Sequence, residues 1–78
     1  MVSTNIDSQR RFLISTAEDL ALAGTKNAMT IASRLTVTIQ NRGWDDDFTE
    51  ADLLEITLEG LSNVAKGKKT KPNFLGFY

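Results

Sequence analysis

The chain has 78 residues, 41% of them hydrophobic and 24% charged, and a net charge of −1. It contains no cysteine and no histidine, which excludes a disulfide and a thiolate metal site and removes the commonest metal ligand. A domain of this size buries only about 60–65% of its unfolded surface. We therefore expect it to gain stability from other protein chains, as an oligomer or as part of a larger assembly.

The first predicted helix covers residues 5–23. Thr4 and Asp7 have the spacing of a capping box, in which two side chains satisfy the first amide groups of a helix. Gly24 follows as a terminator that tolerates the left-handed conformation. Between them, apolar residues recur at helical spacing. These residues are Ile6, Leu13, Ala17, Leu20 and Ala21.

The second predicted helix covers residues 26–41, with Thr25 as its cap and Gly43 as its terminator. Its apolar stripe consists of Ala28, Ile31, Ala32, Leu35 and Ile39. Residues 35–40 also alternate apolar and polar side chains and are rich in β-branched residues, which is typical of a strand. The helical stripe begins earlier and covers more residues, so we favour a helix and keep a strand as the alternative.

The third predicted helix covers residues 50–65. Thr49 and Asp52 form a capping box, and Phe48 and Leu53 have the spacing of a hydrophobic staple. Lys66 and Gly67 close the helix with a favourable charge and a stop. The predicted core ridge is Leu54, Leu58, Leu61 and Ala65, with Leu53 and Val64 beside it. Gly60 interrupts this helix, either to admit a neighbouring helix or as a simple imperfection.

The two short connections predict neighbouring helices that run roughly antiparallel. The sequence therefore predicts an all-α three-helix bundle in residues 1–65, followed by an extended arm in residues 66–78. Phe12 and Val37 fall outside the apolar stripes, which suggests a second contact surface, although single exposed apolar residues are normal. Trp44 is expected either to cover the core or to anchor an interface.

The C-terminal arm carries four lysines, then a proline, then an apolar end. Three of the six aromatic residues of the chain lie in its last five positions, whereas disordered tails are usually poor in aromatics. Residues 44–65 carry seven acidic side chains and no basic one. This acidic face either steers head-to-tail contacts with the basic arm of another copy or is simply a solvated surface, as charge runs usually are. The predicted partner-binding residues are Lys66, Lys68, Lys69, Lys71, Phe74, Leu75, Phe77, Tyr78, Phe12 and Val37. Phe12 and Val37 would receive the arm of the same chain or of a neighbour.

We expect no enzyme activity, no cofactor and no metal site. Without histidine or cysteine the usual nucleophile–base pairs are missing, and no glycine-rich phosphate loop is present. The run of aspartates at 45–47 does not have the spacing of a calcium loop. The alternative is a small nucleic-acid-binding or regulatory protein that uses the lysines at 66–71, but the acidic third helix would be repelled by phosphates.

The expected function is that of a non-enzymatic structural or adaptor subunit of a larger assembly, for example a virus or bacteriophage particle. The sequence contains no apolar run of the ~18 residues that span a bilayer. The first residues lack the basic and apolar regions of a signal peptide, and Val2 excludes N-myristoylation. We therefore expect an intracellular location or a place within a virus particle, with protein partners and no membrane.

Overall fold

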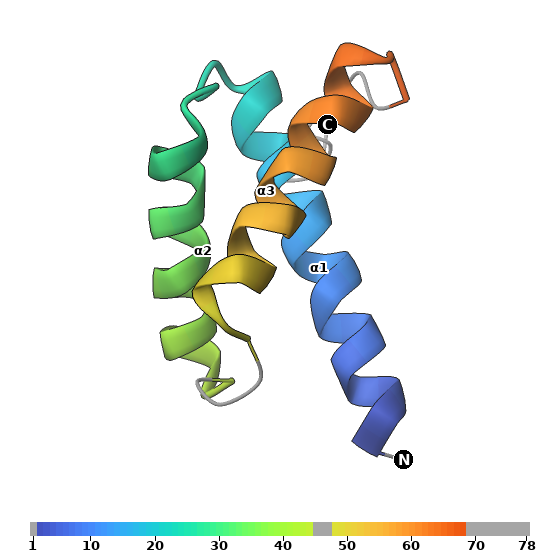
Figure 1. Cartoon of the computed structure of the whole chain (residues 1–78), viewed down its shortest axis with the longest axis vertical. Coiled ribbons are helices and arrows are strands. Elements are labelled where there is room, and N and C mark those ends of the chain that lie inside the picture. Colours follow the sequence, from blue (N-terminus) through green and yellow to red (C-terminus); the bar gives the residue numbers. More distant parts are fainter. Residues whose placement is uncertain (1, 45–47, 69–78) are drawn as a thin grey trace, which may run out of the picture.

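Three α-helices make up the protein in a computed structural model, which describes the backbone of residues 2–44 and 48–68 and the side chains from Ile6 onward. The helices are α1 (Val2–Leu22), α2 (Ala28–Arg42) and α3 (Glu50–Ala65). Figure 1 shows α2 running antiparallel to both α1 and α3, with α3 packed across the other two. The predicted all-α three-helix bundle is confirmed. Of the predicted arm, only Lys66, Gly67 and Lys68 belong to the described residues.

The helices end at the three predicted glycines, Gly24, Gly43 and Gly67, and each has a positive φ. At the end of α2, Gly43 has φ 75° and donates its N–H to the Gln40 carbonyl, while Trp44 donates to the Ile39 carbonyl. This pair of hydrogen bonds satisfies carbonyls that a helix end leaves without partners. The connections are short because the chain turns sharply at these glycines.

Two of the three predicted helix starts are wrong. α1 begins at Val2, so Thr4 and Asp7 lie inside the helix and do not cap it. α2 is capped by Asn27, whose side-chain oxygen accepts from the Thr30 N–H at 3.1 Å. Thr25 is not the cap because it lies three residues before the first residue of α2, in the turn that ends α1, where its N–H donates to the Leu20 carbonyl.

The start of α3 follows the prediction. The Asp52 N–H donates to Thr49 Oγ1 at 3.2 Å, and the Thr49 N–H donates to Asp52 Oδ2 at 3.1 Å. Both halves of the capping box are therefore present. Phe48, just before the cap, packs against the core cluster that contains Leu53. The loop residues 45–47, including the aspartates considered for metal binding, lie outside the described residues.

Residues 35–40 are helical, so the strand alternative is excluded. The threonines in this segment are accommodated because their hydroxyls donate to backbone carbonyls one turn earlier. Thr36 Oγ1 donates to the Ala32 carbonyl at 3.1 Å, and Thr38 Oγ1 donates to the Arg34 carbonyl at 3.0 Å. The buried face of α2 consists of Ile31, Leu35 and Ile39, as the helical spacing predicts.

The core is a single cluster that draws on all three helices. Its buried members are Leu13, Ala17, Ile31, Leu35, Ile39, Leu53 and Ile56. Ile6 was expected in this core but is 40% exposed. The reason is visible in Figure 1, where the first turns of α1 project beyond the ends of α2 and α3.

The predicted core ridge of α3 is only partly right: Leu61 packs against the core and Leu53 beside it is buried, but Leu54 and Leu58 are not in the core. Leu54 and Leu58 are 46% and 57% exposed, and the buried face is formed instead by Leu53, Ile56, Thr57 and Gly60. α3 is therefore rotated relative to the sequence-based expectation. This rotation places two leucines on the surface.

Gly60 explains the rotation, because it lies at the point where α3 meets α1. A Cβ atom at this position would be 2.6 Å from the Cβ of Ala17 and 3.1 Å from the Glu18 backbone nitrogen. Any side chain at residue 60 would therefore push the two helices apart. Of the two interpretations of Gly60, close helix approach is the one that the structure bears out. Ala17 of α1 therefore lies directly against α3 at Gly60.

Two polar contacts connect α1 and α3 on either side of this crossing. The Asn63 side chain donates to Glu18 Oε2 at 2.7 Å, and the Arg10 guanidinium lies 3.5 Å from Glu55 Oε1. The second pair is solvent-exposed and contributes little stability. The two pairs lie on either side of the contact between Ala17 and Gly60 and match the parallel arrangement of α1 and α3.

We expect Thr57→Val to stabilise the protein by about 1 kcal/mol, because it removes a buried polar group that lacks a partner. Thr57 is fully buried, and its hydroxyl oxygen makes no hydrogen bond. Valine has nearly the same shape and supplies a methyl group in place of the hydroxyl. Urea unfolding measures the change. Thr38→Val is the matched control, since the Thr38 hydroxyl is hydrogen-bonded, and it should not stabilise the protein. A destabilised Thr57→Val variant would contradict the assignment.

Candidate protein-binding surface

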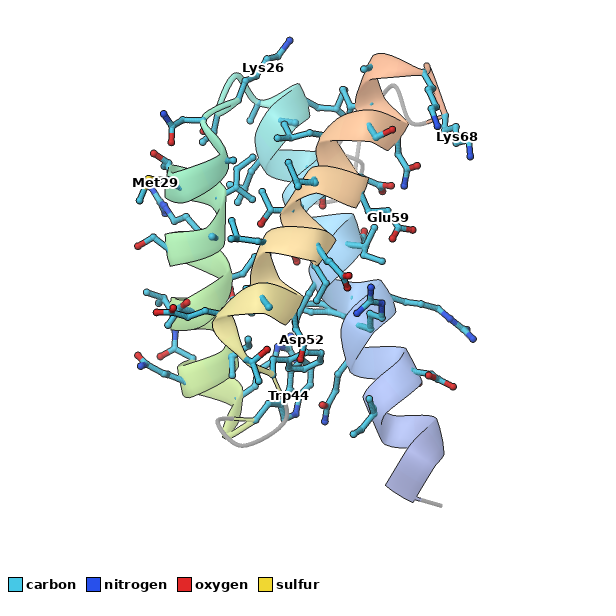
Figure 2. All side chains as sticks on the ribbon, in the orientation of Figure 1. Lys26, Met29, Trp44, Asp52, Glu59 and Lys68 are labelled. Carbon is cyan, nitrogen blue, oxygen red and sulfur yellow. The ribbon has the colours of Figure 1, made fainter. Side chains whose placement is uncertain are left out.

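Among the residues that the structure describes, the most exposed large apolar one is Met29, on α2, at 79%. It lines a groove between α2 and α3, with Leu54 on the opposite wall. We define the α2–α3 groove by its lining residues, Met29, Ala32, Ser33, Thr36, Glu50, Leu53 and Leu54. Figure 2 shows Met29 on the outer edge of α2. Leu58 lies one helical turn after Leu54 and extends the exposed apolar stripe along α3.

The groove is apolar along its walls and acidic at one end. Ala32 and Leu53 contribute apolar surface, and Glu50 brings a carboxylate from the first turn of α3. Ser33 and Thr36 add hydroxyl groups. A surface of this composition suits an extended peptide with apolar side chains and positive charge. The apolar residues of the groove complement the apolar side chains, and Glu50 complements the positive charge.

A second hollow contains two of the three aromatic residues in the described part of the chain, Phe12 and Trp44. Phe12 and Trp44 meet edge to face, with ring centroids 5.9 Å apart and planes at 90°. The Arg42 guanidinium lies over both rings, 4.2 Å from the centroid of Phe12 and 5.3 Å from that of Trp44. This arrangement is stabilised by the attraction between a cation and aromatic faces. Trp44 also packs against the core, as expected of a residue that covers it.

The structure does not bring Phe12 and Val37 together. Phe12, 38% exposed, lines a hollow with Ser8, Gln9 and Trp44. Val37, 50% exposed, lines a separate hollow on α2 with Met29 and Arg34. Val37 is thus connected through Met29 to the α2–α3 groove, whereas Phe12 belongs to the aromatic cluster.

The described part of the arm lies at the far end of α3. Lys66 and Lys68 are exposed there, and Figure 2 shows Lys68 beyond the last turn of the helix. The other predicted partner-binding residues of the arm lie outside the described residues. They are Lys69, Lys71, Phe74, Leu75, Phe77 and Tyr78.

The sequence analysis did not identify Met29, Leu54 or Leu58 as residues of a binding surface. Met29 falls outside the apolar stripe of residues 26–41, so the criterion that identified Val37 also identifies Met29. Leu54 and Leu58 were assigned to the core, and only the packing of Gly60 against Ala17 shows that they point outward.

Across residues 2–44 and 48–68, no three His, Cys, Asp or Glu side chains are grouped so that they could hold a metal ion. None of the helices in this part of the chain has the length and apolar character needed to cross a membrane.

Comparisons with protein-family models, with curated proteins and with solved structures found no match to this chain.

Proposed function

We propose that this chain is a non-enzymatic structural or adaptor subunit of a larger protein assembly. It binds neighbouring subunits through the α2–α3 groove and through its C-terminal arm. By analogy with the extended arms that join subunits in viral particles, a virus or bacteriophage particle is the setting we propose.

The observation that carries this proposal is the exposure of Met29 and Leu54 in one groove, with Leu58 exposed one helical turn further along α3. Single exposed apolar residues are common on soluble proteins and need no explanation. Apolar residues that gather around one concave surface are typical of interaction sites. Burying such a side chain completely contributes about 1.5–3 kcal/mol, so a partner that covers all three would gain substantial binding energy.

The charge distribution favours a protein partner over nucleic acid. Glu50, Glu55 and Glu59 are exposed on α3, beside the apolar stripe. A phosphate backbone would be repelled by this helix. The lysines of the arm would attract phosphates, but they would equally attract an acidic protein surface.

The test is the native size of the chain in the cells that produce it, measured by gel filtration of a gentle lysate. We expect the wild-type chain to elute in a complex many times larger than one copy. The double variant Phe74→Ser/Phe77→Ser should elute as the free chain, because it removes two apolar anchors. Ile6→Ser is the matched control, since Ile6 is an exposed apolar residue outside the groove and the arm. If the wild-type chain elutes as a free monomer, the proposal is wrong.

A further inference from the structure

We propose that the α2–α3 groove binds the C-terminal arm of a second copy of this chain, so that copies join head to tail. This inference rests on the proposed function and names the partner of the same surface. The arm supplies four lysines, then Pro72, then four large apolar residues at 74, 75, 77 and 78. The groove supplies an apolar trough with an acidic end.

The chemistry of the two parts is complementary. Met29, Ala32 and Leu54 offer apolar contacts, and methionine is the side chain that adapts best to an irregular partner. Glu50 lies in the groove, and Asp52 and Glu59 add negative charge elsewhere on the same helix. The lysines of the arm would meet this acidic helix while its aromatic residues enter the trough.

The groove also suits the backbone of an extended peptide. Pro72 favours an extended conformation, which leaves backbone amide and carbonyl groups without internal partners. Ser33 is exposed and carries a hydroxyl that can donate and accept. Thr36 already donates its hydroxyl to the Ala32 carbonyl, and its oxygen remains able to accept.

Chain length favours a second copy over the same chain. Eleven residues separate Ala65 from Leu54 along α3 and fifteen separate it from Glu50, which correspond to about 17 Å and 23 Å. The three residues from Lys68 to Lys71 reach at most about 11 Å when fully extended. In the same chain, therefore, the lysines of the arm fall short of Glu50, which lies in the groove at the start of α3. An arm from a second copy can place its lysines beside Glu50 and its apolar residues in the groove.

Sedimentation velocity of the purified full-length chain tests this inference with three variants. Met29→Asp damages the groove, and Phe74→Ser/Phe77→Ser damages the arm. Gln40→Glu adds one negative charge at an exposed position of α2 outside the groove, as a control. Met29 lies in the first turn of α2, where a carboxylate favours the helix, so Met29→Asp should not unfold the protein. Circular dichroism verifies that each variant retains its helices.

The wild-type chain and Gln40→Glu should associate as concentration rises, whereas each damaged variant should associate at least about 30-fold more weakly. The decisive sample mixes the two damaged variants. One retains an intact arm and the other an intact groove, so together they should form a 1:1 dimer that grows no further. A mixture that stays monomeric overturns the inference, as does a wild-type chain that is monomeric at all concentrations. Because gel filtration of the lysate detects any protein partner, a large native complex with a monomeric purified chain would overturn only the inference.

Discussion

Ile56→Ala is expected to lower the free energy of unfolding by about 3 kcal/mol, whereas Leu58→Ala is expected to lower it by less than about 1 kcal/mol. Ile56 is completely buried in the core cluster, and its truncation leaves a cavity. Leu58 is on the same helix, and more than half of its side-chain surface faces solvent. Urea unfolding monitored by circular dichroism measures both changes.

This pair of variants distinguishes the observed face of α3 from the face predicted by the leucine ridge. The two substitutions are made in one helix, two residues apart, and each removes a similar number of methyl and methylene groups. Differences in helix propensity are small and favour alanine in both cases. A larger loss of stability for Leu58→Ala than for Ile56→Ala would show that α3 is rotated the other way.

Gly60→Ala should destabilise the protein by about 2 kcal/mol, although alanine is the better helix former by about 0.5–1 kcal/mol. The added methyl group would lie 2.6 Å from the Cβ of Ala17. That atom is bonded directly to the backbone of α1 and cannot move aside by rotating a side chain. The two helices must separate, and contacts between α1 and α3 weaken along their length.

A double-mutant cycle with Ala17→Gly tests this cause directly. Ala17→Gly removes the nearest atom that the new methyl group meets. In that background, Gly60→Ala should lower the free energy of unfolding by at least about 1 kcal/mol less than it does in the wild type. Glu59→Ala is the matched control, since Glu59 is exposed and adjacent in sequence. Its effect should be within about 0.5 kcal/mol of zero. If Gly60→Ala lowers the free energy of unfolding equally in the wild-type and the Ala17→Gly backgrounds, close helix approach is ruled out as the cause.

The existence of the three helices and the places where they terminate could be predicted from the sequence, because both depend on local chemistry. Glycines at 24, 43 and 67 end the helices, and the Thr49 capping box begins the last one. The start of α2 was less predictable, since both Thr25 and Asn27 are good capping residues. The choice between them depends on the turn that ends α1, in which Thr25 makes a backbone hydrogen bond.

The buried face of α3 could not be read from hydrophobicity alone. Apolar residues occur around most of its circumference, so several stripes fit a helical period. The face that is actually buried includes Thr57 and Gly60, which a count of large apolar residues passes over. The determining factor is how closely α3 can approach Ala17, and this depends on a residue in another helix.

The candidate surface was predictable only in part, for the same reason. Phe12 and Val37 were identified because they lie outside the apolar stripes, but the structure places them in different hollows. The pairing of Phe12 with Trp44 and Arg42 depends on how the end of α2 packs against α1, which no local pattern specifies. The groove itself exists because the rotation of α3 exposes Leu54 next to Met29.

The most direct test of the groove as a protein interface is the solvent accessibility of the Met29 methyl group, measured by NMR with a soluble paramagnetic agent. We expect this methyl group to be strongly relaxed in dilute solution and protected once the full-length chain associates. The Ile6 methyl groups, which are exposed on the projecting turns of α1, should stay accessible throughout. A Met29 methyl group that remains equally accessible in the dilute and the associated chain would contradict the account.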